Sequence, residues 1–221
     1  MFDALIFDCD GVLVDSEVLA QEVELAALAG IGLDYPRDEF TRRFTGTSAE
    51  DMNAAVAEDF YHRFGRPIPA DFFDELGSAI HCAYAQQLQP IEGAAAMATA
   101  WSKPKAVASS SSGPLVELKL RKVGLADEFY PHVFTADNAR AKPHPDLFLM
   151  AASALRTDTA RCVVVEDSVN GVTAAKRAGM QVIGFIGGAH CEGAHADTLR
   201  QGGADWVFEN FAQVADFLLG G

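Results

Sequence analysis

Short apolar runs that alternate with helical patterns are the feature that most constrains the fold of this chain of 221 residues. The runs are rich in Val, Ile and Phe and are too short for buried helices, as expected of strands buried on both faces. Helical patterns follow at 114–123, 145–155 and 168–178. This alternation predicts an α/β fold with a doubly wound parallel-sheet core. The expected strands are Ala4–Phe7, Lys105–Ala108, His132–Thr135, Cys162–Val165, Val182–Phe185 and Asp205–Phe208.

One long segment breaks the alternation. Residues 16–90 carry helical patterns and no convincing strand, with helices expected at 17–29, 36–44, 49–64 and 71–87. The third of these follows Ser48, which forms a capping-box pattern with Asp51. We therefore predict an α/β core domain of residues 1–15 and 91–221 and an all-helical domain of residues 16–90 inserted after the first strand.

The charge balance restricts the class of partner. The 31 acidic residues outnumber the 17 Lys and Arg residues and give a net charge of −14. Such a chain should repel nucleic acid and anionic membranes, so neither is an expected partner. A phosphorylated substrate would also be repelled, and a site for one needs local cations. No apolar run approaches the roughly 20 residues that span a bilayer.

The N-terminus and the cysteines favour a cytoplasmic location. The chain begins without a basic segment before an apolar run, so a signal peptide is not expected. No C-x-x-C pair is present, and we expect four free thiols in a reducing compartment. The histidines show no metal-ligand spacing and are expected in surface or core roles. The cysteines are Cys9, Cys82, Cys162 and Cys191, and the histidines considered are His62, His81, His190 and His195.

Polar side chains follow four of the predicted strands at the point where each strand ends. Asp8 and Asp10 follow the first strand and Ser109 follows the second. In an open parallel sheet ligands bind beyond the carboxyl ends of the strands, so such residues should converge at one edge. The remaining members of the group follow the third and fourth strands and are Lys142, Glu166 and Asp167.

The chemistry of this group favours a phosphoryl site. Its carboxylates would repel one another without a cation, and oxygen ligands with no His or Cys among them suit Mg²⁺. Ser109 and Lys142 supply a hydroxyl and an ammonium for an anion, as phosphoryl transfer requires. One carboxylate can act as nucleophile, while a second, two residues later, can protonate the leaving oxygen and then deprotonate water.

Each member of the group also has an ordinary structural explanation. Either pair of carboxylates could form a turn or cap the helix that follows, Ser109 could cap a helix, and Lys142 could be a solvated loop charge. The joint pattern is different, because all the members occur in order and each lies at a strand end. The combination therefore favours a functional site.

The same residues resemble the sequence motifs of the haloacid dehalogenase superfamily. Residues 8–16 are similar to its first motif and hinge, and Ser109 matches the second motif. Lys142 within 141–146 matches the third, and residues 166–168 with Gly171 match the fourth. The helical insertion is similar to the family's C1-type cap, so the resemblance covers nearly the whole chain.

The resemblance implies a role for each of these residues. Asp8 would be the nucleophile and a Mg²⁺ ligand. Asp10 would be the general acid and base, and its backbone carbonyl would also bind the metal. The residues that would hold the transferring phosphoryl group are Ser109 and Lys142. The further metal ligands would be Asp167, and Glu166 either directly or through water.

Within the superfamily the chain looks most like the phosphatases grouped around β-phosphoglucomutase. Ala20 stands where the mutase has a cap histidine, and Ala49 stands where it has a cap arginine for the second phosphate. Both departures favour hydrolysis over isomerisation. Asp10 argues against the dehalogenases, which lack this second carboxylate. The phosphonate-cleaving branch needs a cap lysine, and this chain has no lysine before Lys103.

The helical domain offers few cations to an anionic substrate. Residues 16–90 hold 13 acidic residues and 5 arginines. Arg42 and Arg43 adjoin the loop 45–48, which resembles the cap loop that contacts substrate in the family. We expect Arg43 and Gly46 to contact the substrate, the alternative for this Arg pair being a solvated charge at a helix end.

The predicted function is Mg²⁺-dependent hydrolysis of a small phosphate monoester, such as a sugar or sugar-acid phosphate. The reaction would pass through an aspartyl-phosphate intermediate on a monomeric protein. One alternative is a phosphosugar mutase. A second alternative, from another class, is a non-catalytic ligand-binding protein on the same fold, although Asp8 and Asp10 are both retained.

Overall fold

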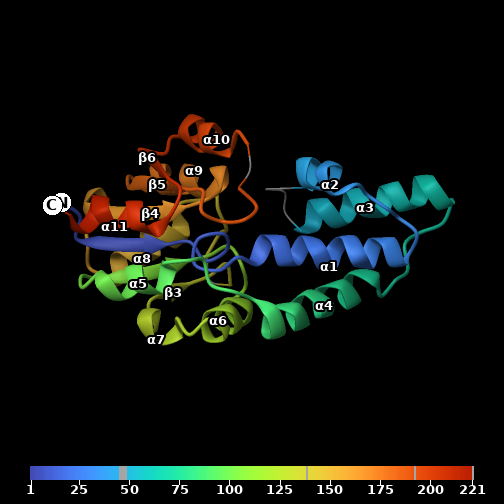
Figure 1. Ribbon diagram of the computed structural model, residues 1–221, viewed down its shortest axis with the longest axis horizontal. Coiled ribbons are helices and arrows are strands. Elements are labelled where there is room, and N and C mark those ends of the chain that lie inside the picture. The colour runs from blue at the N-terminus through green and yellow to red at the C-terminus, as the bar shows by residue number, and fades with distance from the viewer. Residues whose placement is uncertain (45–48, 138, 192, 221) are drawn as a thin grey trace. The chain divides into compact units, whose positions relative to one another are not determined.

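A six-stranded parallel sheet forms the core of the protein, described here from a computed structural model that covers residues 1–44, 49–137, 139–191 and 193–220 (Figure 1). The strand order is β3-β2-β1-β4-β5-β6, with every neighbouring pair parallel. This confirms the predicted fold class. The strands are β1 (Ala4–Phe7), β2 (Lys105–Ala108), β3 (Val133–Phe134), β4 (Cys162–Glu166), β5 (Gln181–Phe185) and β6 (Trp206–Phe208).

The register of the central strands explains why polar residues gather at one edge. Phe7, the last residue of β1, pairs with Val107 of β2 and with Val165 of β4. The chain therefore leaves these three neighbouring strands at almost the same level. All residues of β1 and β4 are buried, as expected of strands covered on both faces.

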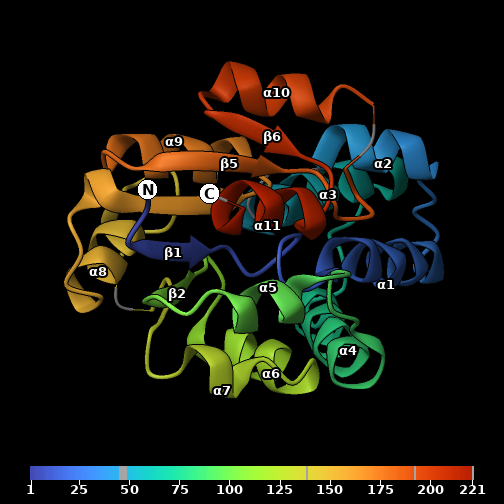
Figure 2. The same cartoon turned by 60° about the vertical axis from the view of Figure 1, so that its left-hand side comes forward.

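Helices cover both faces of the sheet, and Figure 2 shows this layered arrangement. Ile6 faces a cluster that includes residues of α8, α9 and α10. On the opposite face, the ring of Phe7 packs at 5.5 Å from Phe129 of α7 and at 6.3 Å from Phe211 of α11. The helices of the core are α5 (Ala94–Ala100), α6 (Gly113–Lys122), α7 (Ala126–Phe129), α8 (Asp146–Ala154), α9 (Val169–Arg177), α10 (His195–Gly202) and α11 (Phe211–Leu219).

The described chain divides into two compact units, one of residues 1–17 and 88–221 and one of residues 18–87. The second unit has its own apolar core, in which Leu28, Phe40 and Phe60 are buried. The Ser48 capping box lies outside the described residues. The helices of this segment are α1 (Ser16–Gly30), α2 (Arg37–Phe44), α3 (Ala49–Phe64) and α4 (Phe72–Gln87).

Two further expectations concern cysteines and membranes. All four cysteines are free thiols in the structure, and the two that lie in or beside central strands, Cys9 and Cys162, are buried. Among the described helices, none combines the length and the apolar character needed to cross a bilayer.

Candidate active site

Lys142 and two buried carboxylates form the centre of the candidate site. Asp8 directly follows β1, and its backbone N–H donates to the carbonyl of Val165 at 2.9 Å. The Lys142 ammonium donates to Asp8 Oδ1 at 2.6 Å and also to Glu166 Oε1. The Lys142 side chain is only 5% exposed. The structure thus brings together three predicted residues from distant parts of the sequence.

Burial and neighbouring charges shift the protonation equilibria at this centre. Burial raises the pKa of Asp8, and the nearby carboxylates of Glu166 and Asp167 raise it further, while Lys142 opposes them. Burial disfavours the charged ammonium of Lys142, but the attraction of Asp8 and Glu166 outweighs burial and raises the pKa of Lys142. Lys142 is therefore a permanent cation beside Asp8.

Asp8, Glu166 and Asp167 form a buried carboxylate cluster. One oxygen from each lies within 4.8 Å of the others. Glu166 is fixed in place because its Oε2 accepts hydrogen bonds from the Ser168 backbone N–H at 2.9 Å and from the Ser168 hydroxyl at 3.0 Å. Ser168 also caps α9, accepting from the Gly171 N–H at 3.0 Å.

Two glycines leave room for these carboxylates. A Cβ atom on Gly171 would lie 1.8 Å from the carboxyl carbon of Glu166. A Cβ atom on Gly11 would lie 1.9 Å from Asp167 Oδ2, and Gly11 also has a positive φ of 71°. At both positions, the absence of a side chain leaves the space that the carboxylates of the cluster occupy.

The donor set of the cluster fits a hard divalent cation. It offers only carboxylate oxygens, the ligands that Mg²⁺ prefers. Three carboxylates so close together need positive charge beside them, and Lys142 supplies one such charge. Asp8, Glu166 and Asp167 could therefore hold Mg²⁺ next to Lys142.

Asp10, the second carboxylate of the first motif, lies in a separate hydrogen-bond network. Its Oδ1 accepts from the ammonium of Lys119 and from the hydroxyl of Ser16, and its Oδ2 accepts from the Ser111 hydroxyl at 3.0 Å. Burial alone would raise the pKa of Asp10, but Lys119 and the two hydroxyls outweigh it and lower the pKa. Asp10 is therefore held as a carboxylate.

Lys119 is a site residue that the sequence analysis missed. It lies on α6 and its side chain is 3% exposed. A signal was present, because Lys119 shares a helix face with the buried residues Val116 and Leu120 at helical spacing. A lysine in such an apolar stripe needs a buried anion as partner, and Asp10 is that partner.

Ser109 lies where predicted, at the end of β2. It is buried, and its backbone N–H donates to the carbonyl of Phe134 at 2.9 Å. Its hydroxyl oxygen accepts from the Ser111 N–H at 3.1 Å. The neighbouring Ser110 hydroxyl accepts from the Lys142 N–H at 3.3 Å, which joins this loop to the loop that carries the lysine.

Two histidines border the carboxylate cluster. His190 Nε2 lies 2.9 Å from Asp167 Oδ2, and His195 Nε2 lies 2.6 Å from the backbone carbonyl of Asp167. Burial disfavours the charged form of His190, but its hydrogen bonds to Asp167 and Cys191 outweigh burial and raise its pKa to about 11. The sequence predicts surface or core roles for both histidines; both are partly exposed, and both also contact Asp167, a predicted site residue. Sequence spacing could not show this, because Asp167 reaches them only through the fold.

The structure describes both arginines of the pair from which we predict a substrate contact. Arg43 donates to Asp59 from both terminal nitrogens of its guanidinium, Nη1 and Nη2, with Nη2 at 3.1 Å from Oδ1. The guanidinium carbon lies 4.9 Å from the centre of the Phe44 ring. Arg42 is exposed. Gly46 lies outside the described residues.

Comparisons with known proteins agree with this geometry. The profile of the haloacid dehalogenase-like hydrolase family matches residues 2–179. The chain is 28% identical to 6-phosphogluconate phosphatase of Escherichia coli over 197 residues, 85% of this chain and 84% of that protein. It is 31% identical to hexitol phosphatase B of Escherichia coli over 186 residues, 81% of this chain and 82% of that protein.

A solved structure shares the fold over nearly the full length. A haloacid dehalogenase family hydrolase from Deinococcus radiodurans, with bound phosphate and sodium, superimposes with a TM-score of 0.84 at 34% identity. The match covers 99% of this chain and 96% of that chain. The chain therefore belongs to the haloacid dehalogenase-like hydrolase family, among the phosphatases of its β-phosphoglucomutase-like subgroup.

Proposed function

We propose that this protein hydrolyses a small phosphate monoester, such as a sugar or sugar-acid phosphate, through an aspartyl-phosphate formed on Asp8. The observation that carries the proposal is the position of Asp8. It follows the central strand β1, contacts the cation of Lys142 at 2.6 Å and belongs to a buried carboxylate cluster suited to Mg²⁺. A nucleophile, a permanent cation and a site for a hard metal are the parts that phosphoryl transfer needs.

In the first step a carboxylate oxygen of Asp8 attacks phosphorus, and the bond to the leaving oxygen breaks. Asp10 gives a proton to that oxygen, which leaves as an alcohol. Lys142 and Ser109 bind the phosphoryl oxygens and reduce the repulsion between the substrate and Asp8. The neighbouring backbone N–H groups of the loop after β1 provide further donors.

In the second step water attacks the aspartyl-phosphate and regenerates Asp8. Asp10, now a carboxylate, takes the proton from this water, and inorganic phosphate is released. The hydrogen bonds from Lys119, Ser16 and Ser111 favour the form of Asp10 that this step requires. The same contacts disfavour the protonated form needed in the first step, so the balance between acid and base depends on Lys119.

Mg²⁺ would be held by Asp8, Asp167, the backbone carbonyl of Asp10 and Glu166, the last directly or through water. When bound, Mg²⁺ supplies positive charge that offsets the phosphoryl oxygens and the carboxylates.

The relatives support the substrate class. Two of them are named as phosphatases of 6-phosphogluconate and of hexitols. We propose that residues 16–90 act as a cap over the substrate, with Arg42 or Arg43 and the loop around Gly46 in contact with it. We also propose that the protein works as a cytoplasmic monomer. The net charge of −14 supports a small metabolite as partner and argues against nucleic acid and anionic membranes.

The test is phosphate release from a panel of monoesters with Mg²⁺, including 6-phosphogluconate, hexitol phosphates, hexose phosphates and 4-nitrophenyl phosphate. We expect at least one sugar or sugar-acid phosphate to be hydrolysed with a kcat/KM well above that of the Asp8→Asn variant. If the wild type released phosphate no faster than Asp8→Asn on every compound, the protein would be a binding protein on this fold.

A further inference from the structure

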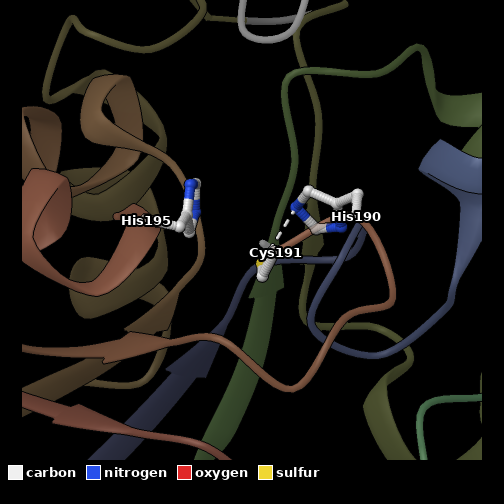
Figure 3. Close-up of side chains that lie close together, drawn as sticks. All are labelled: His190, Cys191 and His195. Carbon is white, nitrogen blue, oxygen red and sulfur yellow. Dashed lines mark hydrogen bonds between the residues drawn. The ribbon is translucent and has the colours of Figure 1, made fainter. Parts of the chain in front are cut away.

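Three side chains next to the proposed active site form a cluster of nitrogen and sulfur donors. His190 and Cys191 lie in the loop after β5, and His195 is the first residue of α10. One donor atom from each residue lies within 4.8 Å of the others. Figure 3 shows Cys191 between the two imidazole rings, whose centres are 5.9 Å apart. The spacing of these residues in the sequence did not indicate that they could be ligands of one ion.

The distances within the cluster suit a bound metal ion. Cys191 Sγ lies 3.3 Å from His190 Nε2. Two ligands of a tetrahedral Zn²⁺ site, with bonds of about 2.0–2.1 Å to nitrogen and about 2.3 Å to sulfur, lie roughly 3.5 Å apart. The sulfur and the nitrogen are therefore already at the separation that a shared zinc ion would require.

His195 has the second contact that metal-bound histidines commonly make. Its Nε2 lies 2.6 Å from the carbonyl oxygen of Asp167, so that nitrogen carries a proton and donates to the carbonyl. The hydrogen bond leaves Nδ1 unprotonated when the ring is neutral, free to act as a ligand. A histidine bound to a metal usually gives its other N–H to such a carbonyl, which fixes the orientation of the ring.

His190 has unfulfilled hydrogen-bonding capacity. Its Nε2 faces both Cys191 Sγ at 3.3 Å and Asp167 Oδ2 at 2.9 Å, although one N–H can satisfy only one of them well. Its Nδ1 is buried and has no hydrogen-bond partner in the described structure. An ion bound to Nε2 would replace the N–H for which Cys191 and Asp167 compete, and the proton of the neutral ring would then lie on Nδ1.

We propose that His190, Cys191 and His195 form a second metal site, which binds Zn²⁺ through one imidazole nitrogen of each histidine and the thiolate of Cys191. Two nitrogens and one sulfur suit zinc, and they differ from the all-oxygen donors of the carboxylate cluster, which suit Mg²⁺. Three protein ligands leave a fourth tetrahedral position for water. All three residues are partly exposed, so solvent and the ion can reach them. Binding releases the thiol proton and any proton on the ligating nitrogens.

Cobalt is a suitable probe because Co²⁺ replaces Zn²⁺ and is coloured. The full-length, reduced protein is freed of metal with chelator, saturated with Mg²⁺ to occupy the carboxylate cluster, and titrated with Co²⁺. We expect one equivalent to give a near-ultraviolet thiolate-to-cobalt absorption and intense visible bands of a four-coordinate ion. One equivalent of Zn²⁺ should abolish both signals.

Four variants test whether the Co²⁺ signal comes from the proposed site. Cys191→Ser should lose the thiolate-to-cobalt absorption. His195→Gln keeps an N–H for the Asp167 carbonyl but lacks the ligating nitrogen, and it should weaken Co²⁺ binding by about 10-fold or more. The matched control is Cys82→Ser, because Cys82 is the exposed cysteine of the helical unit and its loss should leave the signal unchanged. Asp8→Asn should also keep the signal, since carboxylate oxygens produce no thiolate band.

Other outcomes would overturn the proposal. These are the absence of the thiolate band at one equivalent, a band of wild-type strength in Cys191→Ser or His195→Gln, or its loss in Cys82→Ser. Circular dichroism of each variant with Mg²⁺ confirms that it is folded. Because Cys191→Ser and His195→Gln remove different ligands, either one that folds decides the question.

Discussion

Lys142 forms ion pairs with Asp8 and Glu166, so it contacts both the proposed nucleophile and a second member of the carboxylate cluster. This arrangement makes Asp8 the residue on which the proposed chemistry depends most. Asp8→Asn keeps the shape of the side chain but replaces the carboxylate with an amide, a far weaker nucleophile. We expect turnover of the best substrate to fall by roughly 10⁴-fold or more, as for other lost nucleophiles. Steady-state phosphate release measures this, and near-normal turnover by a metal-loaded Asp8→Asn variant would show that Asp8 is not the nucleophile.

Asp10 and Lys119 form the second critical pair at the residue scale. Removing Lys119 leaves the Asp10 carboxylate in a largely buried place without its cation, so Lys119→Met should lower the free energy of unfolding by about 3–5 kcal/mol. Combining it with Asp10→Asn removes the stranded charge, so the double variant should be more stable than Lys119→Met alone. Urea unfolding of the wild type, both single variants and the double variant completes the cycle. If the losses in the free energy of unfolding from the two single variants simply added in the double variant, Asp10 and Lys119 would not be coupled.

The same pair shows what the sequence could and could not reveal about the site. Asp8 and Asp10 were predictable because they follow a recognisable buried strand, and parallel strands end at a common edge. Lys119 and Ser111 were not assigned. The apolar face of α6 indicates that Lys119 is buried, but no local pattern identifies its partner Asp10, which lies about a hundred residues away. Strand ends can be read from periodicity, but hydrogen-bond partners depend on the packed fold.

At the scale of elements, the N-terminal turn of α9 lies next to the carboxylate cluster that we propose as the Mg²⁺ site. Its residue Gly171 lies against the Glu166 carboxyl group, which is buried and fixed by Ser168. In an ordinary helix interior, replacing Gly with Ala raises the free energy of unfolding by roughly 0.5–1 kcal/mol. Gly77 of α4 offers such a position, because a Cβ atom there meets nothing within 4 Å.

We therefore expect the two Gly→Ala changes to affect different properties. Gly77→Ala should raise the free energy of unfolding by roughly 0.5–1 kcal/mol and leave the Mg²⁺ dependence of activity unchanged. Gly171→Ala should displace the Glu166 carboxylate and raise the Mg²⁺ concentration for half-maximal activity by about 10-fold or more. Urea unfolding and Mg²⁺ titration of activity provide the two measurements. Identical Mg²⁺ titrations for Gly171→Ala and the wild type would refute the role given to Glu166.

The elements differ in how well the sequence predicted them. β1 and β2 begin and end where expected, since each is a compact apolar run. Four core helices were not predicted, and three of them lack a clear apolar stripe. α5 is built almost wholly of small apolar residues, α7 has only four residues, and α10 is mostly polar. α11 was missed although its sequence indicates it, because Phe211 and Val214 are apolar residues at helical spacing and Asn210 caps the helix.

At the scale of the whole molecule, the proposed activity depends on a cation that the chain binds through hard oxygens. Chelator should abolish phosphate release, and added Mg²⁺ should restore it. Ca²⁺ should restore it poorly, because it prefers more ligands and longer bonds than Mg²⁺. Phosphate release after dialysis against chelator, followed by titration with each ion, is the measurement. Full activity in excess chelator would exclude a catalytic metal.

The last prediction concerns the acceptor of the phosphoryl group, which distinguishes a phosphatase from a phosphosugar mutase. A mutase must retain a bisphosphate intermediate and turn it round, so it needs cations for a second phosphate. The position matching the mutase's cap arginine is Ala49, the exposed first residue of α3. Arg42 and Arg43 are the nearby candidates to replace that charge, and Arg43 is already paired with Asp59 within its own unit. Residues 16–90 contain no lysine and have 13 acidic residues against 5 arginines, so a second phosphate should be held weakly.

Water should therefore be the acceptor. Ala20 also replaces the mutase's cap histidine, which removes a group that could favour a sugar hydroxyl over water. Incubation with each anomer of glucose 1-phosphate, Mg²⁺ and a bisphosphate primer should release inorganic phosphate faster than it forms glucose 6-phosphate. An Ala49→Arg variant offers a positive test, because the added cation should raise the ratio of isomer to phosphate. If the wild type formed isomer faster than phosphate, the departures at Ala20 and Ala49 would not decide between the two reactions, and the protein would be a mutase.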